Sequence, residues 1–241
     1  MREILTALLP TPVIAVQAGG IGLVFGAVCS AWVSELRRRG LRVAYTRKLF
    51  HFSIFSVAAA VHGLWGLPGT NAYGGVVVLL VLVAVARGEG DGFYEAIARD
   101  SDRPRRSLFV VVPLITTAVG GLASGLLTGP FASVGYLVAG WGDAVAEPVG
   151  ARWGRHPYRV PSLAGVPAER TLEGSLAVLV VGWVAATLAL VGLGQAPDLQ
   201  LLVAALACAN VGAAVEAVSH HGTDNLTVQI AVSLTAMWLV G

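Results

Sequence analysis

Charged residues are scarce in this chain. Asp, Glu, Lys and Arg make up 12% of its 241 residues, apolar residues make up 56%, and the mean hydropathy is +0.74. A water-soluble domain of this size would need far more charge to cover its surface. The composition therefore excludes an ordinary soluble enzyme and predicts an integral membrane protein, for which we expect no nucleic-acid partner.

Cysteine is also rare. The chain has two cysteines, Cys29 and Cys208, and each lies among small apolar residues without the C-x-x-C spacing of a zinc or redox site. We interpret both as packing residues and infer neither a disulfide nor a metal site from them.

Long apolar stretches dominate the sequence instead. A helix needs about 20 apolar residues to span a bilayer, and eight stretches meet or approach this length. They cover residues 12–34, 50–67, 71–87, 107–127, 131–150, 174–194, 199–218 and 225–240. The 30 glycines suit close packing of membrane helices. The predicted fold class is all-α, a transmembrane bundle of about eight helices that forms one domain over residues 1–241.

The positive charge is unevenly distributed. Every Lys and Arg except Arg2 lies in one of three segments, residues 37–48, 87–106 and 152–170. If eight spans alternate in direction, these segments share one side of the membrane, which the positive-inside rule makes cytoplasmic. Both termini are then expected on the outer side of a plasma membrane of prokaryotic type or of an endomembrane.

Two carboxylates interrupt the fifth apolar stretch. No charged residue occurs in residues 107–142, and then Asp143 and Glu147 follow one helical turn apart. Acids at membrane depth are expensive and by default mark a functional site. Together they suit Mg²⁺, which takes oxygen ligands and completes its shell with water and substrate phosphates. The alternative is that both acids pair with Arg152 and Arg155 at the membrane surface.

Three further acids are predicted near the same membrane side. Glu173 begins the sixth stretch, Glu216 lies near the end of the seventh, and Asp224 precedes the eighth. Glu216 is the strongest candidate of the three because its stretch offers no basic neighbour. The alternatives are a favourable first-turn acid for Glu173 and a helix cap formed by Asp224 with Asn225.

Basic residues and one helix start offer sites for phosphate. Arg47, Lys48 (the only lysine) and His51 are neighbours at the entry to the second stretch. An ammonium group suits a point contact to phosphate, and a guanidinium group suits a bidentate clamp. The alternatives are an ordinary anchor at the membrane surface for both cations and a structural histidine at the membrane interface for His51. At the start of the sixth stretch, Thr171 and residues 174–175 offer hydroxyls and open backbone N–H groups, which could cradle a phosphate.

Four segments of the chain occur in an order typical of one family. They read RKLFHF (residues 47–52), GDAVAEPVGARWGR (142–155), ERTLEGS (169–175) and VEAVSHHGTDNLTV (215–228). In these motifs the chain resembles the dolichol kinase/phytol kinase family, polytopic membrane enzymes that phosphorylate isoprenoid alcohols, typically with CTP. The resemblance covers most of residues 45–230.

The resemblance carries functional positions over to this chain. They are Lys48, His51, Gly142, Asp143, Thr171, Glu173, Gly174, Ser175, Glu216, Asp224 and Asn225. One departure is Arg170, which stands where the family usually has lysine. The charge is kept there, but the geometry of a phosphate contact changes.

We therefore predict a CTP-dependent lipid-alcohol kinase with Mg²⁺ as cofactor, which transfers the γ-phosphoryl group to dolichol, phytol or a similar alcohol. Asp143, Glu147 and Glu216 are the predicted metal ligands. Asp143, Glu173 and Asp224 are the predicted catalytic residues. The predicted nucleotide-binding residues are Arg47, Lys48, His51, Gly142, Arg152, Arg155, Arg170, Thr171, Gly174, Ser175 and Asn225.

Two other functions fit the same features. Phosphatidate cytidylyltransferases, which attach CMP to a lipid phosphate, share the G-D-x-x-A and E-G elements. Their closing motif, however, carries a further aspartate that TDNLT (223–227) lacks. A cation or lipid transporter would also use acids within its spans. The clustering of the acids toward one membrane side, rather than along a path, favours the kinase.

Overall fold

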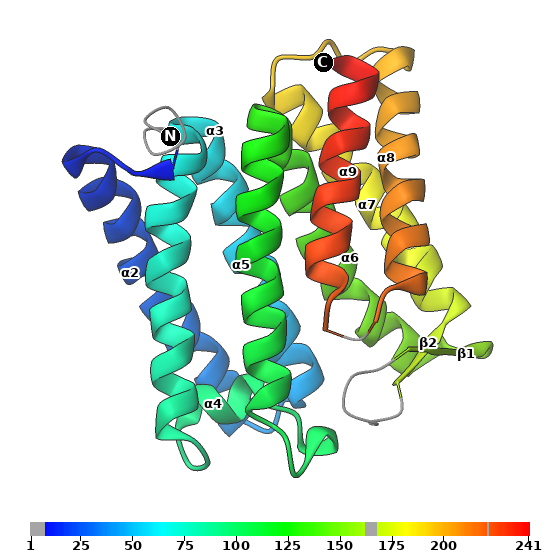
Figure 1. The fold of residues 1–241 in the computed structure, drawn as a ribbon. Helices are drawn as coiled ribbons and strands as arrows, with labels where there is room; N and C mark the ends of the chain where they lie inside the picture. Colours follow the sequence, from blue (N-terminus) through cyan, green and yellow to red (C-terminus); the bar gives the residue numbers. More distant parts are fainter. Residues whose placement is uncertain (1–7, 162–167, 221) are drawn as a thin grey trace.

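The computed structural model describes residues 8–161, 168–220 and 222–241, and this part of the chain is predominantly helical (Figure 1). The helices are α2 (Pro12–Arg38), α3 (Val43–Arg87), α4 (Gly92–Ile97), α5 (Leu108–Thr128), α6 (Ala132–Trp153), α7 (Leu172–Gly192), α8 (Leu199–Val218) and α9 (Asp224–Val240). Two short 3₁₀ turns, η1 (Asp100–Asp102) and η2 (Gly129–Phe131), lie before α5 and α6. The predicted all-α class is confirmed.

Several helices have the length and composition of membrane spans. Five helical stretches qualify, namely Pro12–Arg38, Val43–Arg87, Leu108–Trp153, Leu172–Gly192 and Leu199–Val218. Large apolar side chains also point outward from them, as at Val16 and Val203, which are 75% and 59% exposed. Apolar surface on this scale is typical of contact with lipid. The chain is thus built as an integral membrane protein.

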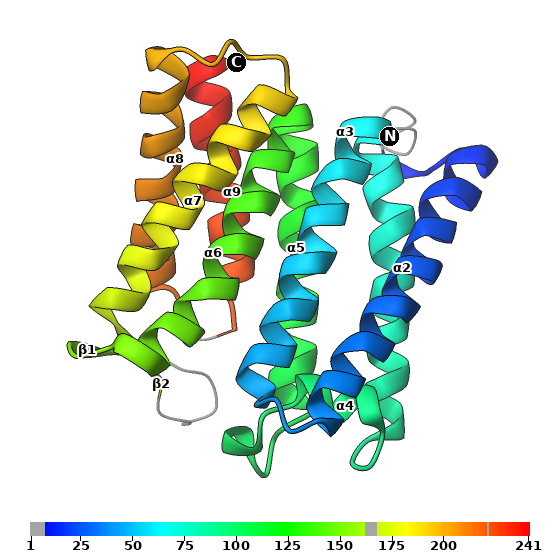
Figure 2. The same cartoon turned by 180° about the vertical axis from the view of Figure 1, so that it is seen from behind.

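Two of these stretches turn back on themselves. Gly66 within α3 has φ 60° and ψ −155°, and Gly129 between α5 and α6 has φ 56°, a conformation that favours glycine. His62 bridges the two reversals, since its ring nitrogens lie 2.9 Å from Thr70 Oγ1 and 2.9 Å from the Gly129 carbonyl oxygen. The two halves of α3 consequently lie side by side, which Figure 1 shows from one face and Figure 2 from the other.

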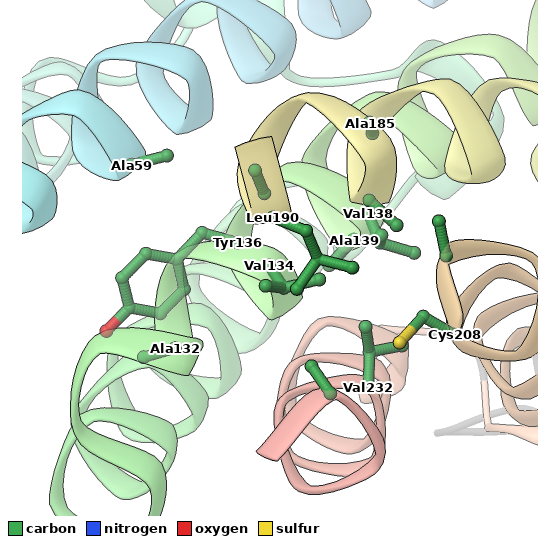
Figure 3. Close-up of a cluster of buried hydrophobic side chains, with 14 of the residues drawn as sticks. Ala59, Ala132, Val134, Tyr136, Val138, Ala139, Ala185, Leu190, Cys208 and Val232 are labelled. Carbon is green, nitrogen blue, oxygen red and sulfur yellow. The ribbon is translucent and has the colours of Figure 1, made fainter. Parts of the chain in front are cut away.

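Helix α6 lies at the centre of the main core. Its side chains Val134, Tyr136 and Val138 belong to one buried cluster with side chains of α7, α8 and α9 (Figure 3). The Tyr136 hydroxyl donates to the Gly121 carbonyl oxygen of α5 at 2.8 Å. Glycines allow the closest approaches, because a side chain at Gly135 would meet α9 and one at Gly140 would meet Phe55 of α3. Small residues therefore set the distance of α6 from both neighbours.

A short antiparallel hairpin follows α6. Strands β1 (Pro157–Val160) and β2 (Ala168–Thr171) pair with Pro157 opposite Thr171. Glycine and proline in residues 151–175 argue against a regular helix there, and part of this segment forms the hairpin. The hairpin places residues 170–171 directly at the start of α7, and its turn lies outside the described residues.

The basic segments gather at one end of the bundle. The α2–α3 connection, α4 with its flanking turns, and the β-hairpin lie together at the lower end in Figure 1, and the C-terminus lies at the opposite end. The α7–α8 connection also lies at that opposite end, as Figure 2 shows from behind. Spans that alternate in direction would place the three basic segments at one end of the bundle, which is the arrangement in the structure.

Candidate functional site

A cavity of about 1050 Å³ is lined by residues of the basic end of the bundle and by residues of α3, α5, α6 and α9. Its basic end is lined by residues that are distant in the sequence. Most of the predicted site residues are among them: Arg47, Lys48, His51, Asp143, Glu147, Arg170, Thr171, Gly174, Ser175, Glu216, Asp224 and Asn225.

The first charged cluster joins α3 to α6. Lys48 Nζ lies 2.7 Å from Asp143 Oδ1 and 3.5 Å from Glu147 Oε2, and the lysine side chain is only 5% exposed. Helix α6 presents both carboxylates to the same lysine because they are one turn apart. The buried ammonium group of Lys48 is thus compensated by two carboxylates and does not act as a cationic anchor at the membrane surface.

Two arginines complete the surroundings of Glu147. Arg47 Nη2 lies 3.5 Å from its Oε2, and Arg99 Nη1 lies 3.4 Å from its Oε1. Burial lowers the pKa of Arg99, but the carboxylates of Glu147 and Asp102 outweigh burial and raise that pKa. Arg99 was not predicted as a site residue, because its sequence neighbourhood of mixed charge gives no sign that it reaches α6.

His51 lies at the edge of the same cluster. Its Nε2 is 3.5 Å from Asp143 Oδ2, and its ring stacks on Phe55 at 4.3 Å. This nitrogen is buried and has no hydrogen-bond partner within the described part of the chain. An unsatisfied buried polar atom in a charged cavity is a place where a bound ligand can supply the missing partner.

The second charged cluster is organised by Arg170 at the end of β2. Its Nε lies 3.0 Å from Glu216 Oε1 on α8, and its Nη2 donates to Asp224 Oδ2 on α9 at 2.9 Å. Asp143, Glu216, Asp224 and Asn225 together line a small cavity beside the large one. Acids from α6, α8 and α9 therefore meet at one end of the bundle.

The donor set suits a hard divalent cation. Asp143, Glu216 and Asp224 offer only oxygen atoms, and Glu216 Oε2 is buried with no hydrogen-bond partner among the described residues. Mg²⁺ needs only one or two carboxylates when water and phosphate complete its shell. The described residues contain no ready-made group of three His, Cys, Asp or Glu ligands. Glu147 differs from the other acids because three cations surround it.

The start of α7 carries the predicted phosphate cradle. Thr171 caps the helix, since its Oγ1 accepts from Gly174 N at 3.1 Å, and the Ser175 hydroxyl lies 2.7 Å from Tyr158 Oη. A Cβ at Gly174 would lie 2.9 Å from the Ala146 carbonyl oxygen of α6. This glycine is thus required by close packing, and the cradle's polar groups already have partners inside the chain.

The other predicted residues have different surroundings and are absent from the described lining of the cavity. Glu173 Oε1 lies 2.7 Å from His156 Nδ1, and the His156 side chain is exposed at the protein surface. Gly142 packs on α7, because a Cβ there would lie 2.9 Å from Val178 Cγ1. Arg152 lies over the ring of Trp153, and Arg155 is exposed.

The alternative pairing of the two α6 acids with arginines near the end of that helix is wrong. In the described residues Asp143 and Glu147 pair with cations of α3 and with Arg99, so tertiary contacts replace the expected neighbours in sequence.

One relative connects the chain to a known family. Over 200 residues it is 30% identical to the phytol kinase of a Synechocystis species, and the match covers 80% of this chain and 81% of that protein. No protein-family model matches the chain. No solved structure matches it either.

Proposed function

The chain belongs to the phytol kinase/dolichol kinase family, and we propose that it transfers the γ-phosphoryl group of CTP to the hydroxyl of an isoprenoid alcohol. The observation that carries this proposal is a single cavity with a charged basic end and an apolar interior. The charged end suits a nucleotide triphosphate, and the interior suits a lipid tail.

The cations of the two clusters would bind the phosphates. Lys48 of α3 and Arg170 of β2 both line the cavity, with carboxylates as their present partners. Preorganised positive groups aimed at the transferring phosphoryl stabilise the charge that develops in the transition state. The negative phosphate oxygens of the nucleotide would replace part of the ion pairing that the carboxylates now provide to these cations.

Asp143 and Glu216, two of the predicted metal ligands, would hold Mg²⁺, with water and phosphate oxygens completing its shell, and the ion would supply positive charge at the nucleotide phosphates. Their placement around one small cavity and the unpartnered oxygen of Glu216 support this assignment.

The alcohol proton requires an acceptor near the attacking oxygen. We propose that the alcohol oxygen bonds to the γ-phosphorus, the bond from this phosphorus to the bridging oxygen breaks, CDP leaves, and Asp224 accepts the proton. Asp224 lines both cavities, whereas Glu173 faces His156, so the structure favours Asp224 among the two acids considered for this step.

The orientation in the membrane follows from charge. If the two halves of α3 and the shorter α9 each cross the membrane, the proposal has eight passes, and the three basic segments would then share the cytoplasmic side. The site would face the cytoplasm, where nucleotides are available, and both termini would lie outside.

The test of the activity is a double-label experiment. The purified protein is incubated with phytol, Mg²⁺ and CTP labelled at either the γ- or the α-phosphate, and the lipid product is counted. We expect only the γ-label in the lipid, and loss of transfer in Asp143→Asn by at least about a hundredfold. Incorporation of the α-label would instead indicate cytidylyl transfer, and ion or lipid flux without nucleotide consumption would indicate a transporter. Competition by unlabelled ATP and UTP measures the selectivity for the base.

A further inference from the structure

One cation of the charged end comes from a segment that lies outside the four family-like motifs. Arg99 follows helix α4 in the connection between α3 and α5, and it lines the large cavity. Its side chain is 15% exposed, and its Nη1 lies 3.4 Å from Glu147 Oε1 on α6. The connection between α3 and α5 therefore contributes a charged side chain to the same site as the helices and the hairpin.

The backbone on both sides of Arg99 is held in place. Thr46 Oγ1 of α3 donates to the Ala96 carbonyl oxygen at 2.6 Å, and both residues are fully buried. Arg106 Nη2 donates to the Ala98 carbonyl oxygen at 2.7 Å. Thr46 directly precedes the two cations of the first charged cluster, so one turn of α3 positions these cations and the segment that carries Arg99.

Asp102 sets the direction of the Arg99 guanidinium. Its Oδ2 accepts from Arg99 Nε at 3.0 Å, and the Asp102 side chain is only 5% exposed. Because a guanidinium group is planar, a partner at Nε restricts the plane in which the two Nη atoms lie. Within that plane Nη1 faces Glu147 at the cavity. Asp102 is therefore placed to position Arg99 without lining the cavity itself.

Three cations share one carboxylate at this point of the cavity. Arg47 Nη2 and Lys48 Nζ each lie 3.5 Å from Glu147 Oε2, and Arg99 approaches Oε1. All three distances exceed the about 2.7–2.9 Å of a tight charge-assisted hydrogen bond. Asp143, the closer partner of Lys48, is also a proposed ligand of Mg²⁺. A bound ion would leave these cations with less negative charge around them, and phosphate oxygens would restore the balance.

We propose that Arg99 binds the phosphates of the nucleotide and that Asp102 is its positioning residue. Arginine suits this contact because its fork of N–H donors matches phosphate oxygens. Arg99 thus joins Lys48 and Arg170 at the phosphates, but from a segment outside the membrane spans. The proposal rests on the proposed function, since the nucleotide is the ligand of that same site. The competing role is structural: Arg99 would only fasten its segment to α6 through Glu147.

The test separates nucleotide binding from folding. The KM for CTP, the KM for phytol, kcat and the melting temperature are measured for the parent, Arg99→Met, Arg99→Lys and Asp102→Asn. The matched control is Arg103→Met. Arg103 lies on the same segment, pairs with Glu89 and Asp100, is 55% exposed and is absent from the described lining of the cavity.

The expected result is a selective loss of nucleotide binding. Arg99→Met should raise the KM for CTP at least about tenfold, the scale of one hydrogen bond to a charged group, and change the KM for phytol less than about twofold. Arg99→Lys should recover part of the loss, because the charge is kept and the fork is not. Asp102→Asn should raise the KM for CTP about threefold or more, because the guanidinium loses its charged partner. Arg103→Met should match the parent.

Two results would overturn the proposal. One is a parental KM for CTP in Arg99→Met. The other is an equal rise of both KM values together with a lower melting temperature, which is what a structural role alone would produce. If Arg99→Met does not fold, Arg99→Lys and Asp102→Asn decide by the same criterion: a selective rise in the KM for CTP supports the proposal, and parental values refute it.

Failure of the proposed function is recognised separately. If the parent phosphorylates no alcohol, equilibrium dialysis with labelled CTP plus Mg²⁺, and with inorganic tripolyphosphate, tests the arginine directly. Binding to the parent and to Arg103→Met that is weakened at least about tenfold in Arg99→Met would support the phosphate contact. Equal binding to all three proteins, or no binding to the parent, would refute it.

Discussion

At the residue scale, the site is a set of compensated charges. Lys48 and Arg170 are almost completely enclosed, and each contacts two carboxylates. Removing one partner of such a pair leaves a buried charge without compensation, which is more damaging than removing the pair. These cations therefore affect both the stability of the protein and the binding of nucleotide.

Lys48→Met tests this double role. Loss of the ammonium leaves Asp143 buried without its 2.7 Å partner, so we expect the free energy of unfolding to fall by about 3–5 kcal/mol. We expect turnover of the protein that remains folded to fall at least about a hundredfold. The control is Arg159→Met on the hairpin, where the arginine side chain is 92% exposed. Normal turnover in Lys48→Met would remove this lysine from the site.

Variants of Asp224 and Glu173, two acids near the hairpin, distinguish a catalytic role from a structural one. Asp224→Asn is expected to lower turnover at least about a hundredfold, because the proposed proton acceptor is lost. Glu173→Gln is expected to leave turnover within a few-fold of the parent, since Glu173 pairs with His156. The measurement is kcat for phosphoryl transfer in both variants. The opposite order of effects would exchange the roles assigned to these two acids.

At the element scale, helix α4 and its flanking turns position Arg99 beside α6. Arg106 fastens this segment, since its Nη2 lies 2.8 Å from Glu95 Oε2 and 2.7 Å from the Ala98 carbonyl oxygen. The Arg106 side chain is only 3% exposed, and Glu89 and Asp100 contact it as well. This network lies outside the membrane-spanning helices. It fixes the segment that carries Arg99, which in turn contacts Glu147 of the site.

The network predicts a pH dependence of stability. The hydrogen bond from Arg106 lowers the pKa of Glu95 below its usual value of 4.5. A carboxyl group whose pKa is lower in the folded state stabilises the protein above the usual pKa, and this contribution is lost as pH falls through the folded-state pKa. We expect the Tm of the parent to fall as the pH is lowered from about 5 to about 3, because this contribution is complete above the usual pKa and is lost below it.

Glu95→Gln should show a smaller part of this fall, measured by thermal unfolding at both pH values. Glu169→Gln on the exposed hairpin is the control and should behave as the parent does. An identical pH dependence in the parent and Glu95→Gln would contradict this assignment.

Packing of α6 against α3 depends on a glycine. A side chain at Gly140 would overlap the ring of Phe55, so we expect Gly140→Val to lower the free energy of unfolding by about 1–3 kcal/mol or more. The control is Gly192→Val at the end of α7, where a Cβ would have no described atom within 4 Å. The measurement is chemical denaturation in detergent. Equal stability of the two variants would show that α3 can move away from α6.

At the scale of the whole molecule, the bundle has a charged end and an apolar end. The hairpin and α4 share the first end, and the C-terminus lies at the second (Figures 1 and 2). A cavity extends from the charged end into the bundle. Under the proposed function it would bring a water-soluble donor to a lipid acceptor that stays in the membrane.

The orientation of the two ends is testable by labelling. Arg159→Cys places a thiol on the hairpin, and Ala196→Cys places one on the α7–α8 connection; both positions are exposed, and both native cysteines are buried. In intact cells, a membrane-impermeant thiol reagent should label Ala196→Cys and leave Arg159→Cys unmodified until the membrane is opened. The reverse labelling pattern would show that the charged end faces the outside of the cell.

The sequence by itself determined the class of molecule. Scarce charge and repeated apolar stretches require a helical bundle in a membrane, because hydropathy and helix length are properties of local sequence. The position of Asp143 among apolar residues also identified it as a site candidate, since an acid at membrane depth needs a partner.

Only the tertiary structure decided which charges are partners. Helix packing brings Lys48 to Asp143 and Arg170 to Glu216, and it separates Glu173 from the cavity. No local pattern encodes these distances, because they depend on how glycines let helices approach and on where a hairpin ends. The cavity was undetermined by the sequence for the same reason, since a cavity is the space that several packed helices leave open.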